Sequence, residues 1–231
     1  MLPDFEAGTV LLIDKPYGWT SFDVVNWVRW RTKRITGNKK LKVGHAGTLD
    51  PLATGLVMVC TGKMTKEIDQ IQAGTKVYTG TIFLGATTPS YDMETRVSGR
   101  VPVAHLTEEM LLAAAQKLTG DIEQIPPHFS AKKINGQPAY KKAHKGIKVE
   151  MRPNAVTVYG FELTRIDLPQ VEFRITCSKG TYIRSLAHDF GKELGCGGFL
   201  AALRRTESGN FRVSEAYKMG DLKIMLDKPY Q

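Results

Sequence analysis

The sequence predicts an α+β fold in which helices flank a mixed, largely antiparallel central sheet. Three observations support this fold class. Strand-like and helix-like runs follow one another without regular β-α alternation, two strand-like runs are joined by a short proline turn, and no internal repeat is present. With 231 residues, of which 42% are apolar, the chain is long enough for one large core, so we expect a single domain over 1–231.

The expected strands are short runs that are either continuously apolar or alternate between apolar and polar residues. They lie at 9–13, 56–60, 76–84, 156–165 and 171–177. Asp167-Leu168-Pro169 joins the last two runs, which predicts an antiparallel hairpin.

Helices are expected where apolar residues recur three or four positions apart after a capping residue. The first begins at Thr20 or Ser21, with Phe22 and Val28 spaced for one buried face and Trp30 on the core side. Further helices are expected at 63–72, 107–120, 139–145 and 181–194. The segments 41–55, 85–96 and 126–138 are rich in Gly, Pro or Thr, which predicts shaped loops.

No apolar run is long enough to cross a bilayer, and the first residues lack the basic start and apolar core of a signal peptide. We therefore expect a cytoplasmic protein that does not bind membranes. The three cysteines, Cys60, Cys177 and Cys196, have no C-x-x-C spacing, which predicts buried thiols and no metal site.

Basic residues outnumber acidic ones, 32 to 23, and the formal charge of +9 indicates an anionic partner. The excess is concentrated in a basic stripe without acids, formed by Arg29, Arg31, Lys33, Arg34, Lys39, Lys40 and Lys42. Such a stripe suits a phosphate backbone, and the alternative is a solvated face that binds nothing.

Common catalytic signatures are absent from the sequence, including G-x-S-x-G, H-E-x-x-H, G-x-G-x-x-G and C-x-x-C. The segment 55–64 superficially resembles a phosphate loop. Six residues separate its glycines, and Met64 stands where a phosphate loop has Ser or Thr, which excludes a nucleoside triphosphatase.

The glycine-rich loop at 44–55 holds one carboxylate, Asp50, and no other charged residue besides the ionisable His45. Its glycines allow a ligand to approach the backbone closely, while Pro51 forces Asp50 towards the extended region. This pattern indicates a reactive carboxylate beside the basic stripe. The alternative is that Asp50 caps a turn and His45 is an ordinary surface histidine.

This loop resembles the catalytic motif of the TruB family of tRNA pseudouridine synthases, and the resemblance covers nearly the whole chain. Further matching segments follow in the family's order at 12–21, 76–78, 120–127, 177–184 and 203–205. The resemblance implies the pseudouridine synthase fold. It also implies an isomerisation in which the bond from N1 of uridine to the ribose C1′ breaks and C5 is joined to C1′, without any cofactor.

By this resemblance the catalytic residues are Asp50, Tyr78 and Arg184. Asp50 is the carboxylate that attacks either C1′ or C6, a choice that the sequence leaves open. A paired guanidinium on Arg184 would keep Asp50 ionised in a pocket that loses water. Tyr78 would stack on the target base and offer a hydroxyl for proton transfer at C5.

Substrate-binding roles are implied in the same way for His45, Lys15, Asp92, Tyr182 and Leu203. A target base inside a folded loop must be flipped out, and His45 matches the residue that fills the vacated space. Asp92 aligns with an acid near the flipped uridine, although the preceding 87–89 departs from the more acidic family pattern.

Contacts to the RNA backbone are expected from the basic stripe and from lysines of a family insertion near 121–152 that grips the T-arm of tRNA. These lysines are Lys132, Lys133, Lys141 and Lys142, with Lys145 and Lys148 beside them. Only 26 residues follow Arg205, too few for the RNA-binding PUA domain of many relatives. We therefore expect a stand-alone, bacterial-type monomer that needs no guide RNA.

The predicted function is isomerisation of the T-loop uridine of tRNA, position 55, to pseudouridine. The alternative is a tRNA folding factor that binds and opens the tRNA elbow, with catalysis secondary. An RNA methyltransferase is disfavoured because the chain lacks a glycine-rich loop for a methyl donor.

Overall fold

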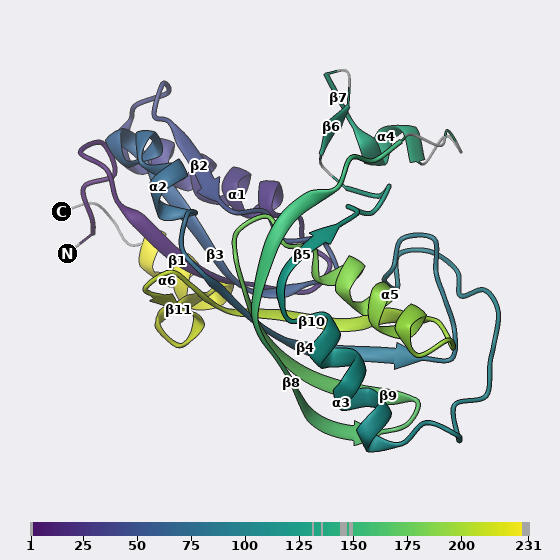
Figure 1. Cartoon of the computed structure of the whole chain (residues 1–231). Helices are drawn as coiled ribbons and strands as arrows, with labels where there is room; N and C mark the ends of the chain where they lie inside the picture. Colours follow the sequence, from purple (N-terminus) through teal and green to yellow (C-terminus); the bar gives the residue numbers. More distant parts are fainter. Residues whose placement is uncertain (1, 131, 135, 144–146, 148–149, 228–231) are drawn as a thin grey trace. The chain divides into compact units, whose positions relative to one another are not determined.

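The computed structural model describes residues 2–130, 132–134, 136–143, 147 and 150–227. The chain forms two compact units (Figure 1). The terminal unit contains Met1–Tyr78 and Arg204–Gln231, and the central unit contains Thr79–Leu203. The chain passes from one unit to the other within two strands, β4 (Lys76–Leu84) and β10 (Gly198–Ser208).

The terminal unit is built on a mixed sheet. Its strands, in sheet order, are β12 (Tyr217–Lys218), β1 (Val10–Lys15), β3 (Thr54–Thr61) and β10, with β2 (Val43–Ala46) on β3 and β11 (Phe211–Arg212) on β10. β3 pairs antiparallel with β1 and β2 but parallel with β10, where Arg205 faces Gly55. Gly55 has φ +100°, and a Cβ there would lie 2.3 Å from the carbonyl oxygen of Arg205. The two backbones therefore approach closely only because residue 55 is glycine.

Helix α1 (Ser21–Thr36) begins with a capping box between Thr20 and Asp23 and ends at Gly37, which adopts the left-handed conformation. Its buried stripe is formed by Ser21, Val24, Val25, Val28 and Thr32. The expectation that Phe22 and Trp30 face the core is wrong, because each is 58% exposed. At 100° per residue, Phe22 is turned by roughly 100° and Trp30 by roughly 180° from the centre of that stripe.

The remaining helices of the terminal unit are short. They are α2 (Ile68–Ile71), α6 (Met219–Leu226) and the 3-10 turns η1 (Gly62–Lys66) and η2 (Val213–Glu215). The expected helix at 63–72 is thus divided into η1 and α2. A small core forms around Ala46, Leu56 and Met58.

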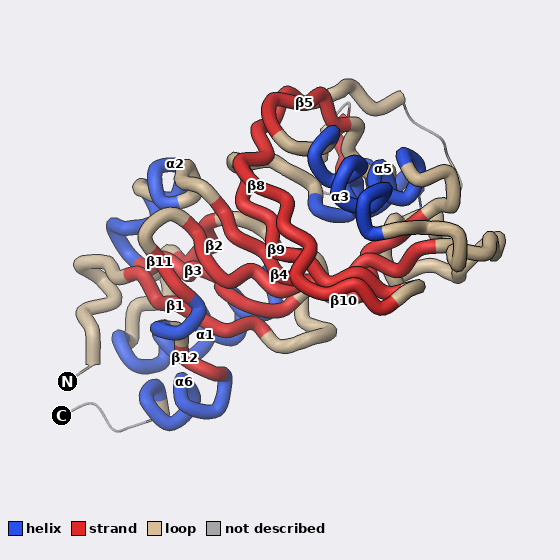
Figure 2. The backbone as a smooth tube through the Cα atoms, turned by 60° about the horizontal axis from the view of Figure 1, so that its bottom comes forward, coloured by secondary structure: helices blue, strands red, loops and turns tan. Residues whose placement is uncertain are grey.

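The central unit is an antiparallel sheet with two helices. Its strands follow β10 in the order β4, β9 (Gln170–Cys177), β8 (Asn154–Asp167) and β5 (Gly120–Gln124). α3 (Glu108–Lys117) and α5 (Ile183–Glu193) lie side by side on one face of these strands (Figures 1 and 2). Phe161, Phe173 and Phe190 pack between sheet and helix. β6 (Lys133–Ile134), β7 (Gln137–Pro138) and α4 (Ala139–Ala143) complete the unit.

The predicted fold class is confirmed, because antiparallel pairs predominate among the described strands, β1–β12 and β3–β10 are parallel, and helices flank the sheet. The β8–β9 hairpin and the bounds of β4 are also as predicted. β2, β5 and the eleven-residue β10 were not predicted as strands. The single-domain description, with its insertion near 121–152, stays a prediction.

All three cysteines are free and buried, as expected. In the part of the chain that the structure describes, no helix combines the length and apolar character needed to span a bilayer. The described residues also contain no group of three or more His, Cys, Asp or Glu side chains arranged to hold a metal ion.

Candidate active site

A buried lysine anchors the loop that carries Asp50. Lys15, at the end of β1, is fully buried, and its Nζ donates hydrogen bonds to the carbonyl oxygens of Pro16, Trp19 and Pro51. Burial lowers the pKa of Lys15 to about 8, while the negative charge of Asp50 opposes that shift. With three backbone acceptors around its ammonium group, Lys15 supports the loop next to Asp50.

A hydroxyl group at the start of α1 fixes the residue on the other side of Asp50. Ser21 Oγ accepts a hydrogen bond from the Leu49 N–H at 2.8 Å and lies 3.1 Å from the Leu49 carbonyl oxygen, to which it donates. Within the loop, the Ala53 N–H donates to the Asp50 carbonyl at 3.1 Å, which closes a turn around Asp50. Asp50 itself is half-buried. Its backbone is therefore held before, at and after the carboxylate.

A third anchor comes from Arg205, which is 1% exposed. Its Nε donates to the Leu56 carbonyl at 2.8 Å, and its Nη2 donates to the Gly47 carbonyl at 3.0 Å. Gly47 has φ +83°, and a Cβ there would lie 3.3 Å from Nη1 of Arg205. The guanidinium thus fixes the first half of the loop, where glycine allows both the backbone conformation and the close contact.

His45 precedes this contact on β2 and is half-buried. Burial lowers its pKa first, the charge of Arg205 lowers it further, and a hydrogen bond with the Gly47 backbone partly opposes both effects. The ring is therefore kept in its neutral form, which suits the predicted role of filling the space of a flipped base. Tyr78, another predicted site residue of this unit, is buried in β4.

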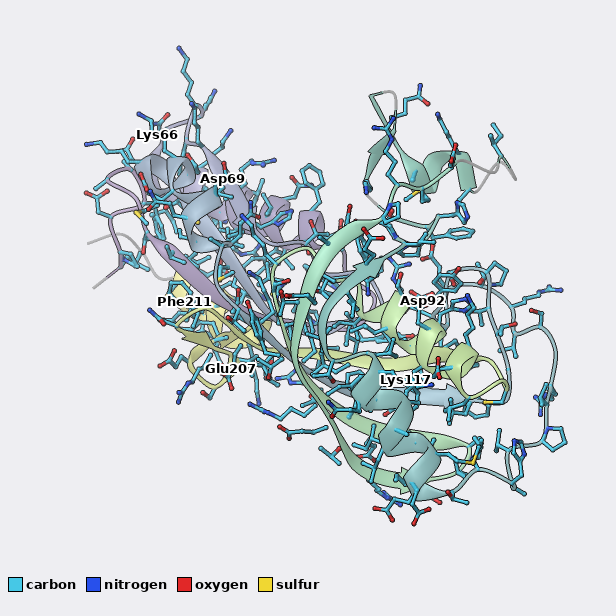
Figure 3. The ribbon with its side chains drawn as sticks, in the orientation of Figure 1. Lys66, Asp69, Asp92, Lys117, Glu207 and Phe211 are labelled. Carbon is cyan, nitrogen blue, oxygen red and sulfur yellow. The ribbon has the colours of Figure 1, made fainter. Side chains whose placement is uncertain are left out.

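In the central unit the structure brings Arg184 and Asp92 together. Arg184 lies in the first turn of α5, and its Nε is 3.6 Å from Oδ2 of Asp92. Both side chains are buried, with 4% and 7% exposed. Nη1 of Arg184 donates to the Ser90 carbonyl at 3.1 Å, and Oδ1 of Asp92 accepts from the Glu94 N–H. The buried ion pair thus joins α5 to the loop between β4 and α3. Figure 3 labels Asp92 near α5.

The start of α5 is fixed by Gln124, the last residue of β5. Its Oε1 accepts from the Tyr182 N–H at 2.7 Å, and its Nε2 donates to the Tyr182 carbonyl at 3.0 Å. Tyr182 is the N-cap residue of α5, two positions before Arg184. Leu203, the other predicted contact of this unit, is buried in β10.

The predicted catalytic residues divide between the units. Asp50 and Tyr78 belong to the terminal unit, and Arg184 belongs to the central unit. The pairing of Asp50 with Arg184 stays a prediction. Sequence reasoning missed Ser21, Arg205 and Gln124 as supports, although all three lie inside the matching motifs at 12–21, 203–205 and 120–127.

The arginines of the basic stripe have partners inside the terminal unit. Arg29 donates to the Asn26 side chain and to the Val43 carbonyl. Arg31 and Arg34 both pair with Asp227, and their guanidinium groups stack 3.6 Å from the Trp27 ring and 4.8 Å from the Trp30 ring, respectively. These arginines thus connect α1 with the end of α6.

The lysines of the stripe are more available to solvent. Lys39, Lys40 and Lys42 are exposed, and Lys33 is half-buried. Among the other predicted contacts, Lys132 donates to the Arg152 carbonyl and the Asn154 side chain. The side chains of Lys133 and Lys141, and all of Lys145 and Lys148, lie outside the described residues.

A basic groove of about 510 Å³ lies in the terminal unit. It is lined by Arg29, Leu41, Lys42, Val43, Gly44, Thr65 and Lys66, so it contains three cations and no acid. Figure 3 labels Lys66 in this region. Lys66 was not predicted as a binding residue, although it lies two residues after the segment that resembles a phosphate loop.

Comparison with known proteins agrees with the sequence resemblance. Residues 33–183 match the model of the TruB family pseudouridylate synthase N-terminal domain, and residues 184–228 match the tRNA pseudouridylate synthase B C-terminal domain. Two relatives named tRNA pseudouridine synthase B, from Flavobacterium johnsoniae and Parabacteroides distasonis, are 49% and 50% identical to this chain. The matches cover 92% and 97% of this chain and 93% and 96% of the relatives.

Among solved structures, the crystal structure of a Cbf5-Nop10-Gar1 complex contains a similar chain, with a TM-score of 0.68 and 31% identity. The match covers 92% of this chain and 53% of that one, so this chain corresponds to about half of that protein.

Proposed function

Because the chain belongs to the TruB family of pseudouridine synthases, we propose that it isomerises the T-loop uridine of tRNA, at position 55, with Asp50 as the reacting carboxylate. The family membership makes the chain a pseudouridine synthase acting on tRNA, and the proposal adds the position and the residues.

The chemistry needs one carboxylate and a way to hold it. In the proposed reaction Asp50 attacks C1′ or C6 of the flipped uridine, the bond from N1 to C1′ breaks, and the uracil turns. C5 is then joined to C1′, the bond to Asp50 breaks again and releases the carboxylate, and the freed N1 takes up a proton. The proton on C5 then leaves, and the Tyr78 hydroxyl is the proposed acceptor or relay. Arg184 keeps the carboxylate ionised when the entering base displaces water.

The observation that supports this proposal most is the anchoring of the Asp50 loop. Lys15, Ser21 and Arg205 hold the backbone at Pro51, Leu49 and Gly47. A reacting group must be held in a near-attack geometry to accelerate a reaction, and three buried polar anchors within five residues supply that rigidity.

RNA binding is proposed for the exposed lysines of the basic stripe and for the basic groove. Arg29, Lys42 and Lys66 give the groove positive charge, and no acid is among its lining residues. The groove is lined by the start of β2, whose next residue is His45. We propose the T-arm of tRNA as the bound element, with the protein acting as a monomer and without a guide RNA.

The test is Asp50→Asn, assayed by tritium release from tRNA that carries 5-labelled uridine. We expect release to be abolished while tRNA binding is retained, because the amide keeps the shape of the side chain and loses its nucleophilicity. Asp69→Asn is the matched control, since Asp69 is an exposed acid of the same unit, and it should leave release unchanged. Full activity in Asp50→Asn would refute the proposal. Retained tRNA refolding in the same variant would reveal an additional folding role.

A further inference from the structure

The backbone of Tyr91 adopts an unusual conformation. Its φ is +63°, and it is the one non-glycine residue with positive φ among the residues that the structure describes. A left-handed conformation is uncommon for a bulky side chain and persists only where surrounding contacts impose it. Tyr91 stands between Ser90 and Asp92, and Arg184 contacts both of these residues.

The ring of Tyr91 stacks on His188 of α5. The ring centroids are 3.9 Å apart, and the planes differ by 13°. His188 follows Arg184 by four residues, so both side chains project from the same face of α5. One helix face thus contacts three consecutive loop residues. Arg184 binds the Ser90 carbonyl and the Asp92 carboxylate, and His188 covers the Tyr91 ring between them.

The same loop is fixed on its other side by β10. The Leu200 N–H donates to the Tyr91 carbonyl at 2.9 Å, and Asp92 forms an isolated bridge with Leu200. The Thr88 hydroxyl donates to the Asp92 carbonyl at 2.7 Å. Tyr91 therefore lies between a strand that holds its backbone and a helix that holds its ring.

The stack is poorly suited to a role in core packing alone. Both rings are half-buried, whereas Asp92 and Arg184 beside them are buried. Burial lowers the pKa of His188, which favours the neutral ring and a flat contact with the phenol. The contact therefore fixes the direction of the loop more than it fills the interior.

We propose that Tyr91 is a positioning residue for the reaction: its ring, stacked on His188, holds the left-handed turn that keeps Asp92 against Arg184. This inference rests on the proposed function, because the guanidinium of Arg184 matters for catalysis only if it acts on the reacting carboxylate. In the proposed mechanism Tyr91 touches no reacting atom. It acts through Asp92 and Arg184.

The experiment compares Tyr91→Gly with Tyr91→Phe in the full chain, by steady-state kinetics on tRNA. Glycine accepts the positive φ without strain, so Tyr91→Gly removes the stacked phenol without forcing the backbone out of its conformation. We expect kcat to fall by about 10- to 100-fold with KM unchanged, because a misplaced supporting group costs rate and not binding. Tyr91→Phe keeps the ring and should restore the wild-type kcat.

Tyr159→Gly is the matched control, since it removes a 59% exposed ring from β8 of the same unit and should leave kcat unchanged. A second variant, His188→Leu, removes the stack from the other side. It should lower kcat to a similar extent, and the double variant Tyr91→Gly/His188→Leu should lose little more, because both changes remove one contact.

A wild-type kcat in Tyr91→Gly, or a change confined to KM, would overturn the inference. If thermal unfolding shows that Tyr91→Gly is not folded, His188→Leu decides, and a wild-type kcat in that variant overturns the inference. Failure of the proposed function gives a different result, because the wild-type protein itself would then form no pseudouridine. In that case the proposed role of Tyr91 would also be refuted.

Discussion

The loops that carry Asp50 and Asp92 are both anchored by buried cations, but the cations bind different atoms. Around Asp50, Lys15 and Arg205 donate to backbone carbonyl oxygens of Pro51 and Gly47. Around Asp92, Arg184 pairs with the carboxylate itself. A loop anchored through its backbone can direct its carboxylate at a substrate, whereas a carboxylate in a buried ion pair serves to position its partner. This difference supports the proposed roles, in which Asp50 reacts and Asp92 supports Arg184.

The largest expected effect separates the two carboxylates. Asp50→Asn should lower kcat by about 10⁴-fold or more, as loss of a nucleophile does. Asp92→Asn should lower kcat by only about 10- to 100-fold, because it disturbs a supporting group. It should also lower the free energy of unfolding by about 3 kcal/mol, since a buried guanidinium loses its carboxylate. Kinetics and urea unfolding of both variants check this, and equal losses of kcat would remove the distinction.

The second prediction compares two adjacent arginines of β10. Arg205→Gln should lower the free energy of unfolding by about 2–4 kcal/mol, because the carbonyl groups of Gly47 and Leu56 lose a charged donor inside the protein. Arg204→Gln breaks the ion pair with Asp14, in which the arginine is 39% exposed, and should cost about 1 kcal/mol or less. The contrast can be measured by urea unfolding. The pKa of His45, followed by NMR, should rise in Arg205→Gln alone, and an unchanged value would argue against the electrostatic effect of Arg205.

The third prediction concerns Lys15 and pH. Its pKa is about 8 in the folded protein, below its ordinary value of 10.5, so between these two pH values the unfolded chain binds the extra proton. The contribution of Lys15 to the free energy of unfolding is therefore lowest below pH 8 and rises by about 1 kcal/mol per pH unit from pH 8 to 10.5. Unfolding of the wild type and Lys15→Met at pH 7.5, 9 and 10 isolates this slope. A difference between the two proteins that does not change with pH would contradict the burial of the ammonium group.

The smallest expected effect tests whether the terminal unit, which carries Asp50, also binds the tRNA backbone. Lys66→Gln should reduce the slope of log affinity against log salt by about one unit, because one phosphate contact is lost, and should leave kcat unchanged. Lys117→Gln, an exposed lysine of the central unit that pairs with Glu193, is the control and should leave the slope unchanged. A lower kcat in Lys66→Gln would place the groove in catalysis and weaken the division between binding and reaction.

Local patterns in the sequence predicted the fold class, the β8–β9 hairpin and the family of the Asp50 loop. They failed where distant residues decide the environment. β10 was missed because Arg204 and Arg205 interrupt an apolar run, yet Arg205 is buried against carbonyl groups from Gly47 and Leu56, more than 140 residues earlier. No local sequence pattern indicates that carbonyl groups so far away in the chain will accept hydrogen bonds from Arg205. The positive φ of Tyr91 was not predicted either, because its contacts with His188 and Leu200 come from residues about 100 positions later in the chain.

The prediction for the aromatic residues of α1 was wrong for a related reason. Trp30 was expected on the core side of the helix. In the structure the guanidinium of Arg34 covers its ring, so a solvent-facing tryptophan is stabilised by a cation from the same helix. The sequence spacing predicted the helix, but it did not predict which of its aromatic residues are buried in the core.

The close approach of β3 and β10 at Gly55 limits how this protein can vary. A methyl group at residue 55 would meet the Arg205 carbonyl at 2.3 Å, so even alanine forces the strands apart. That displacement would carry the guanidinium of Arg205 away from Gly47 and loosen the loop that carries Asp50, the proposed reacting carboxylate. In a library randomised at residue 55 and selected for tRNA modification, we expect only variants with glycine to be recovered. Activity therefore depends on a side chain no larger than a hydrogen atom at this position.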